Sequence, residues 1–311
     1  MKKELKMTTN PSYKTFNNLA FGFSIIELDK KDYTNWLLSN FLGVYYRINW
    51  GTISFKLPHC YMWKCFRHKM IIYKSNKYNS FITAIENQIN DDQYIYLCVN
   101  EKYIPNRTHY CKKNYLHDIY IYGYDNDNKI FLTAGYNLSG HFSQQKIPYE
   151  SVFLAQKNKL LKNVFFSFSI INNFNYDLVN IKKVKRQIYR HFFSINIFYG
   201  IKIYDWTIKH YKSREFIDFT YPSLIVEHIS VISKLNVLGY NIDCKNLVEL
   251  SEKLLNLTLK YDITYDKNII KNLINLINQI KTTEICAFKS FFSQNKFLYS
   301  VYKLKYQKYL L

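Results

Sequence analysis

Several residue types that define special classes of protein are scarce in this chain of 311 residues. Six Cys are too few for a disulfide scaffold, and eight Gly with five Pro exclude collagen-like and low-complexity classes. No apolar run reaches the roughly 18 residues of a membrane helix, and no apolar stretch follows the basic N-terminus as in a signal peptide. We therefore expect a cytoplasmic protein with reduced thiols and no membrane partner.

Acidic residues are also few, with 23 against 43 Lys and Arg, so the formal net charge is +20. The excess is concentrated in residues 156–214, which hold 12 basic and two acidic residues. A solvated basic face or an acidic protein partner explains this segment better than a nucleic acid. Only six of the basic residues are Arg, which base readers and phosphate clamps favour, so nucleic-acid binding is the least favoured of the three interpretations.

Apolar residues make up 48% of the chain, enough to bury a sizeable core. In the first half, aromatic and β-branched runs predict strands over residues 94–99, 118–124, 129–134, 142–147 and 164–171. The DNDN sequence at 125–128 favours a hairpin turn, because Asp and Asn form Asx-turns. Helices are predicted around 33–46 and 80–90.

After residue 176 the pattern is helical. Apolar residues recur with spacings of three and four at Leu247, Leu250, Leu254 and Leu257, and again at Ile270, Leu273, Ile277 and Ile280. A last helix is predicted over 286–311. The sequence thus predicts an α+β fold with two domains, an antiparallel-sheet domain over 1–160 and a mainly helical domain over 161–311.

The segment 115–140 carries the pattern with the clearest chemical meaning. His117 stands at the start of a predicted strand, which turns at Gly123-Tyr124-Asp125 and is followed by a second strand. In papain-like peptidase folds a catalytic His opens one strand, and an acid or amide on the next strand orients it. Histidine suits a general base because its pKa is near neutrality. Asp118 adjoins His117 but points to the opposite strand face, so it cannot orient that imidazole.

This segment resembles the N-terminal domain of the butirosin biosynthesis protein H family, a papain-like family of acyltransferase type. Further similar stretches are YTNWLLSNFLGVYY at 33–46, YIP at 103–105, and the helical sequences at 200–211 and 217–238. The resemblance implies a papain-like (cysteine-peptidase-like) sheet half and places the catalytic base at His117. It also implies acyl transfer from an acidic acyl carrier protein or peptidyl carrier domain to a small-molecule amine, in a specialised-metabolite or nonribosomal-peptide pathway.

Two departures from this family stand out. Gly135 occupies the position where the family has its orienting Asp, and the matching N-terminal region has Ser12 but no Cys. The candidate nucleophiles are therefore Ser12, Cys60, Cys65 and Cys111. One interpretation is an active acyltransferase or cysteine-peptidase-like hydrolase, and the alternative is an inactive pseudoenzyme that binds an acidic carrier or biosynthetic partner.

The remaining candidate sites give no strong signal. His59, Cys60, Cys65 and His68 could chemically bind zinc, but their spacing is not that of a familiar zinc site. No Gly-rich phosphate loop is present. We expect neither a metal nor a nucleotide cofactor, and we assign His228, within a predicted helix, to helix packing.

Overall fold

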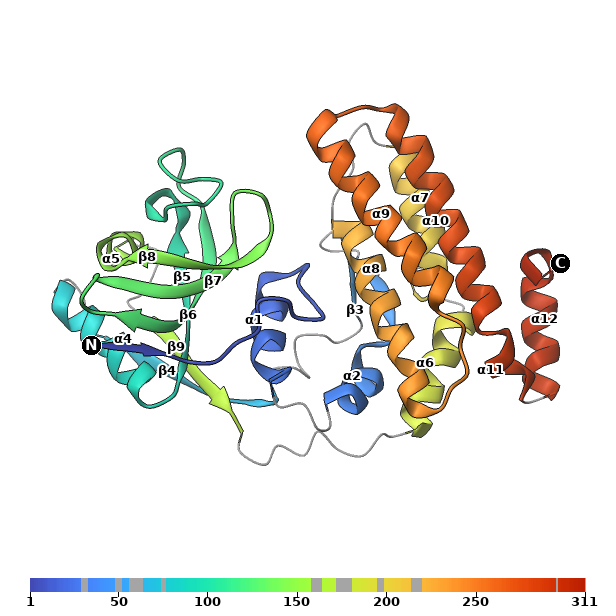
Figure 1. The fold of residues 1–311 in the computed structure, drawn as a ribbon, viewed down its shortest axis with the longest axis horizontal. Coiled ribbons are helices and arrows are strands. Elements are labelled where there is room, and N and C mark those ends of the chain that lie inside the picture. Colours follow the sequence, from blue (N-terminus) through green and yellow to red (C-terminus); the bar gives the residue numbers. More distant parts are fainter. Residues whose placement is uncertain are drawn as a thin grey trace. The chain divides into compact units, whose positions relative to one another are not determined.

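In the computed structural model the chain forms two compact units (Figure 1). Unit 1 comprises Met1–Lys30 and His59–Asn175, and unit 2 comprises Lys31–Pro58 and Tyr176–Leu311. Unit 1 is built on an antiparallel sheet and unit 2 is mainly helical, so the predicted α+β class is confirmed. The structure describes residues 1–28, 33–47, 52–55, 64–73, 77–157, 164–171, 181–194, 199–213, 220–294 and 296–310.

Unit 1 contains a seven-stranded sheet with the order β4-β9-β5-β6-β7-β8, and β1 also pairs with β6. All of its pairings are antiparallel. The strands are β1 (Lys2–Glu4), β4 (Phe66–Ile72), β5 (Tyr94–Asn100), β6 (Leu116–Asp125), β7 (Ile130–Tyr136), β8 (Phe142–Pro148) and β9 (Val164–Ile170). The five predicted strands are confirmed as β5 to β9. Strand β4 was not predicted, because its polar and charged residues interrupt the pattern of a buried strand.

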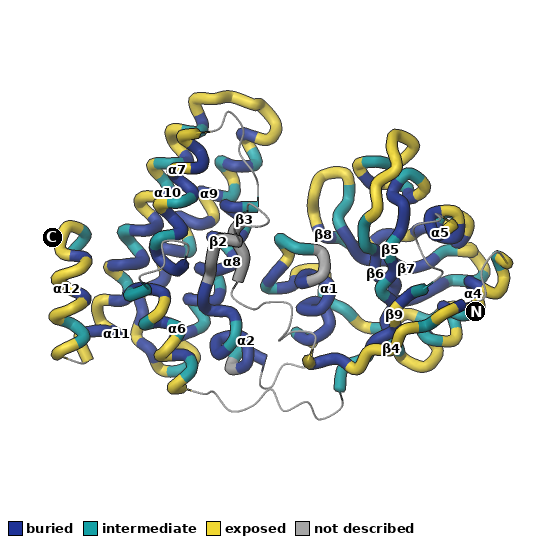
Figure 2. Tube along the Cα trace, turned by 180° about the vertical axis from the view of Figure 1, so that it is seen from behind, coloured by how far each residue is buried: buried dark blue, intermediate teal, exposed yellow. Residues whose placement is uncertain are grey.

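Helices pack on both faces of this sheet. The core on one face joins α4 (Tyr78–Asn90) and α5 (Tyr149–Gln156) to inward-pointing residues of β5 and β6, which are mostly buried (Figure 2). On the other face, Phe21 of α1 (Asn17–Ile26) stacks on Tyr120 of β6 with ring centroids 4.0 Å apart. Because side chains alternate along a strand, neighbouring residues of β6 belong to different cores.

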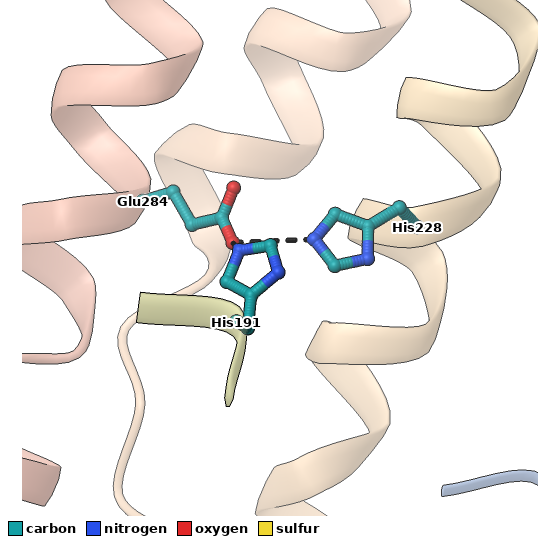
Figure 3. Close-up of side chains that lie close together, drawn as sticks. All are labelled: His191, His228 and Glu284. Carbon is teal, nitrogen blue, oxygen red and sulfur yellow. Dashed lines mark hydrogen bonds and ion pairs between the residues drawn. The ribbon is translucent and has the colours of Figure 1, made fainter. Parts of the chain in front are cut away.

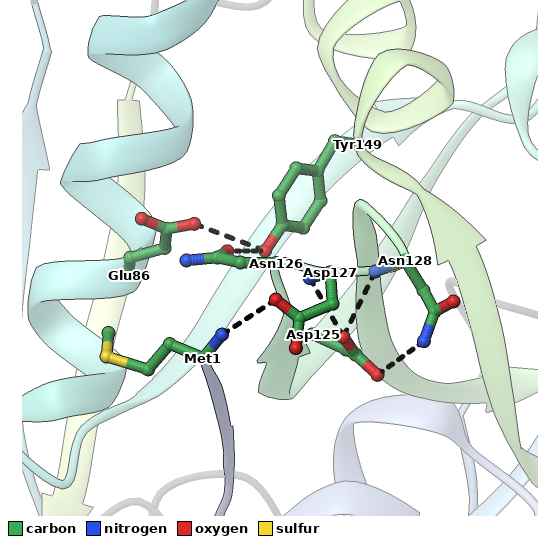
Figure 4. Close-up of polar contacts among 7 residues, drawn as sticks. All are labelled: Met1, Glu86, Asp125, Asn126, Asp127, Asn128 and Tyr149. Carbon is green, nitrogen blue, oxygen red and sulfur yellow. Dashed lines mark hydrogen bonds and ion pairs between the residues drawn. The ribbon is translucent and has the colours of Figure 1, made fainter.

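The predicted hairpin joins β6 to β7 through an Asx-turn (Figure 4). Asp125 Oδ1 accepts hydrogen bonds from the backbone N–H groups of Asp127 and Asn128, each at 3.1 Å, and its Oδ2 accepts one from Asn128 Nδ2. The hydroxyl of Tyr149 donates to Asn126 Oδ1 at 2.6 Å and so ties the turn to α5. Local side-chain chemistry therefore determines this turn.

Unit 2 is a helical assembly with a short antiparallel hairpin, β2 (Val44–Arg47) and β3 (Thr52–Phe55). Its helices are α2 (Tyr33–Phe41), α6 (Ile181–Phe193), α7 (Lys202–Ser213), α8 (Thr220–Ser233), η3 (Lys234–Leu238), α9 (Lys245–Thr264), α10 (Asn268–Ala287), α11 (Lys289–Ser293) and α12 (Lys296–Leu310). The apolar stripes predicted for α9 and α10 are largely buried. Within the described ranges, no helix has both the length and the apolar character to cross a membrane.

Two helix predictions in unit 2 were wrong in extent. The helix expected over 33–46 ends at Phe41, and β2 follows it after Gly43. A Cβ atom at Gly43 would lie 2.1 Å from the hydroxyl oxygen of Tyr199, so a larger residue at this corner would have to displace the Tyr199 side chain. The helix expected over 286–311 is instead divided among the end of α10, α11 and α12.

Candidate functional site

His117 and Glu101 form a polar pair at one end of the sheet in unit 1. His117 Nδ1 lies 2.9 Å from Glu101 Oε1, with Glu101 6% exposed and His117 29% exposed. An ionised carboxylate can only accept, so Nδ1 carries the hydrogen and donates it to Glu101. In the neutral imidazole, Nε2 is then the nitrogen that can accept a proton, and no described residue hydrogen-bonds to it. This is the arrangement of a histidine oriented to act as a base.

Asn100 holds the Glu101 backbone in place where β5 ends and the short 3₁₀ helix η2 (Glu101–Tyr103) begins. Its Oδ1 accepts from the backbone N–H groups of Lys102 and Tyr115, each at 3.2 Å. The Glu101 N–H donates to the Tyr115 carbonyl at 2.8 Å. Since Tyr115 directly precedes β6, these bonds fix Glu101 next to the start of the strand that carries His117.

The charge of Glu101 is maintained by its neighbours. Burial alone would raise its pKa, but the hydrogen bond and charge of His117, with the charge of Arg107, lower it below the ordinary value. Arg107 is 2% exposed, and burial lowers its pKa against the opposing charges of Glu101 and Asp118. None of its three guanidinium nitrogens has a hydrogen-bond partner among the described residues. Glu101 is therefore ionised and able to orient His117.

The buried side chain of Arg107 packs directly against the backbone of β7 at Gly135. A Cβ atom at Gly135 would lie 2.2 Å from Arg107 Nη2 and 2.9 Å from Cζ. The backbone of β7 therefore leaves room for a buried guanidinium at the position where the resemblance expects an orienting Asp. The carboxylate that contacts His117 comes instead from Glu101 on η2, which sequence reasoning missed.

Asp118 lies on the sheet face opposite to His117. It pairs across the strands with Cys98, whereas His117 pairs with Val99 of the α4–α5 core. Burial raises the pKa of Asp118, although His117 and Arg107 oppose the shift. The strand alternation thus keeps Asp118 away from the imidazole plane.

Among the candidate nucleophiles that the structure describes, Cys111 lies in a loop that is bonded to the residue next to Glu101. Its thiol is exposed, its φ is +56°, and its N–H donates to the carbonyl of Lys102, next to Glu101, at 3.0 Å. In the same loop the rings of His109 and Tyr115 pack with centroids 4.4 Å apart. The described contacts include none between Cys111 and His117.

The other candidates are placed less favourably. Cys65 is fully buried, and burial raises its thiol pKa to about 12, which leaves little thiolate at neutral pH. The Ser12 N–H donates to Glu27 at the end of α1, and Tyr136 donates to the nearby Lys14 carbonyl. This segment lies on the α1 side of the sheet, not on the His117 side. Cys60 lies outside the described residues, as does His59 of the zinc interpretation.

A second histidine–carboxylate cluster, in unit 2, was not predicted as a set. His191 of α6, His228 of α8 and Glu284 of α10 converge in its core, with exposures of 1%, 1% and 0% (Figure 3). Burial would raise the pKa of Glu284, but the two nearby imidazoles reverse this shift and lower it. The sequence separates these residues by 37 and 56 positions, so no local pattern connects them.

No protein-family model matches the chain, and no curated protein matches it. The papain-like family resemblance therefore stays a prediction, and the geometry of the two histidine–carboxylate groups carries the functional argument.

Proposed function

We propose that the protein catalyses acyl transfer, with His117 as general base and Glu101 as the residue that positions it. The observation that carries this proposal is the 2.9 Å contact between His117 Nδ1 and the buried carboxylate of Glu101. A base oriented by a third group is the usual means of activating a weak nucleophile. The proposal retains the papain-like (cysteine-peptidase-like) fold, with Glu101 replacing the family's orienting Asp.

Cys111 is the proposed nucleophile. His117 Nε2 takes the thiol proton, and the thiolate attacks the carbonyl of an acyl thioester on a carrier. A carbon–sulfur bond to Cys111 forms, the bond to the carrier sulfur breaks, and the proton passes to the leaving thiol. An amine acceptor then attacks the acyl-enzyme, forming an amide and returning the hydrogen to Cys111. With water as the acceptor, the same site would hydrolyse the thioester.

The exposed side of α6 supports an acidic carrier as the partner. Lys182, Lys185, Arg186 and Arg190 are exposed at helical spacing, and the helix contains no acidic residue. Acyl carrier and peptidyl carrier domains are acidic, so this surface, together with the net charge of +20, would steer their association.

Thiol labelling tests the catalytic proposal. Iodoacetamide is added near neutral pH, and intact mass is followed for the wild type, His117→Ala, Glu101→Gln and Cys111→Ser. We expect one fast-labelling thiol that is absent in Cys111→Ser, lost in His117→Ala and slowed in Glu101→Gln. His109→Ala, which removes a neighbouring imidazole, should label like the wild type. Uniformly slow labelling that is insensitive to His117 would contradict the proposal.

A second candidate function is carrier binding without chemistry. It is favoured by Gly135, which stands where the family has its orienting Asp and packs against Arg107, and by the absence of Cys from the N-terminal region. It predicts salt-sensitive binding of an acidic carrier domain with no acyl adduct on the protein. Charge reversal at Lys185 and Arg186 should weaken that binding. Equal competition by double-stranded DNA would point to the nucleic-acid interpretation instead.

A further inference from the structure

The cluster of His191, His228 and Glu284 brings three metal-binding side chains together in the core of unit 2. Both imidazoles present Nε2 to the same carboxylate oxygen, Oε1 of Glu284, at 2.7 Å for His191 and 3.2 Å for His228. The candidate ligand atoms of the three residues all lie within 4.8 Å of one another. Each residue comes from a different helix, as Figure 3 shows.

Hydrogen bonding accounts for only one of the two imidazoles, because His228 Nε2 hydrogen-bonds to Glu284 Oε1 at 3.2 Å. His191 Nε2 has no hydrogen-bond partner despite its 2.7 Å distance from Glu284 Oε1, so its N–H direction is out of line with the oxygen. The Nδ1 atoms of both rings are buried without a described partner. Buried polar groups are ordinarily hydrogen-bonded, so the unpaired Nε2 of His191, directly beside Glu284, calls for another explanation.

A metal ion between the three side chains supplies that explanation. Ligand atoms around a tetrahedral zinc ion are about 3.3 Å apart, given metal–ligand distances of about 2.0–2.1 Å. The His228 separation of 3.2 Å matches that value, and the His191 separation of 2.7 Å is shorter, so that His191 would move slightly away from Glu284 to admit the ion. The Tyr204 hydroxyl donates to the second oxygen of Glu284, Oε2, which leaves Oε1 directed toward the imidazoles. Such support of a ligating carboxylate is typical of metal sites.

We propose that His191, His228 and Glu284 bind one zinc ion, with Tyr204 positioning the carboxylate. Two imidazoles and one carboxylate suit zinc better than magnesium or calcium, which prefer oxygen ligands. The ion would neutralise the buried carboxylate and join α6, α8 and α10. Because all three side chains are at most 1% exposed, the ion would be enclosed in the core of unit 2.

The first test measures the metal on the full chain. The protein is produced in zinc-supplemented medium, purified without chelator, and analysed by mass spectrometry of metal content and by zinc X-ray absorption. We expect about one zinc per chain with only nitrogen and oxygen ligands at about 2.0–2.1 Å. A zinc-free chain would overturn the proposal. So would a sulfur ligand at about 2.3 Å, which would place zinc on cysteines such as Cys60 or Cys65.

The second test assigns the ligands. Zinc affinity is measured by competition with a chromophoric chelator for the wild type, His191→Gln and His228→Gln. Each substitution should weaken binding at least tenfold. His210→Gln, which removes another buried imidazole of unit 2, should keep the wild-type affinity. Wild-type affinity in both ligand variants would refute the assignment, and if either variant fails to fold, the X-ray absorption of the wild type decides alone.

Discussion

The two units each contain histidine beside a glutamate, and the two groups differ in their access to water. In unit 1 a single imidazole is 29% exposed and contacts a carboxylate that is 6% exposed. In unit 2 two imidazoles and their carboxylate are at most 1% exposed. The same residue types therefore suit different tasks. A base must reach its substrate, whereas a fully buried cluster can only support structure or hold an ion.

The two carboxylates also differ in the charged and polar groups beside them. Glu101 shares its surroundings with Arg107, whose buried guanidinium helps to lower the Glu101 pKa. Glu284 has its two imidazoles and the Tyr204 hydroxyl as partners. Removing Glu284 therefore leaves three buried groups without their shared partner and away from water, so its loss should cost more stability than the loss of Glu101.

The largest effect is expected for Glu284→Ala, measured in the presence of a chelator so that bound zinc does not contribute. The His228 imidazole and the Tyr204 hydroxyl lose their buried acceptor and His191 loses its ion-pair partner, so the free energy of unfolding should fall by about 3–5 kcal/mol. Urea denaturation followed by helical circular dichroism measures this loss. Glu101→Ala should cost less, about 1–2 kcal/mol, because His117 can turn to water. Equal losses of stability in Glu284→Ala and Glu101→Ala would contradict the difference in burial between the two histidine–carboxylate groups.

Gly200→Ala should be the next most damaging change. Gly200 has a φ of +64°, and a Cβ atom there would lie 2.1 Å from the carbonyl oxygen of His191. Backbone strain and the clash together should cost about 2–4 kcal/mol. Gly239→Ala is the matched control, since its φ is +78° but its added Cβ meets nothing within 4 Å. It should lose only about 1 kcal/mol, and a loss as large as that of Gly200→Ala would show that the His191 contact is unimportant.

In unit 1, Gly135→Ala should displace the Arg107 guanidinium, because the new methyl group would overlap Nη2. We expect a loss of about 1–3 kcal/mol in stability and slower thiol labelling. A double-mutant cycle tests the cause, because in an Arg107→Ala background the same glycine substitution should cost much less. Additive losses would mean that Arg107 is not what requires glycine at this position.

The smallest expected effect is a dependence of the free energy of unfolding on pH that arises from Glu101. Its pKa is lower in the folded protein than in the unfolded chain, so its stabilising contribution is present above the unfolded value of about 4.3. That contribution is lost as the pH falls through the folded pKa. Wild type should exceed Glu101→Gln by about 1 kcal/mol at pH 5, and the difference should shrink toward pH 3. A difference that is constant over this range would contradict an ionised Glu101.

Much of unit 1 was predictable because its strands are encoded locally. Aromatic and β-branched runs identified β5 to β9, and Asp125 identified the turn between β6 and β7. Strand β4 was missed because Arg67, His68 and Lys69 interrupt its apolar pattern. The helix predicted past Phe41 ends there, and Gly43, which packs against the distant Tyr199, leads into β2.

The sequence by itself determined the α+β class, the apolar stripes of α9 and α10, and His117 as the residue to examine. Periodicity and turn chemistry act over a few residues, so they can be read directly from the chain. Only the tertiary structure decided which carboxylate meets His117, why Gly135 must lack a side chain, and that His191, His228 and Glu284 share one core. Each of these facts depends on side chains from separate elements, whose proximity arises only when the sheet and helices pack.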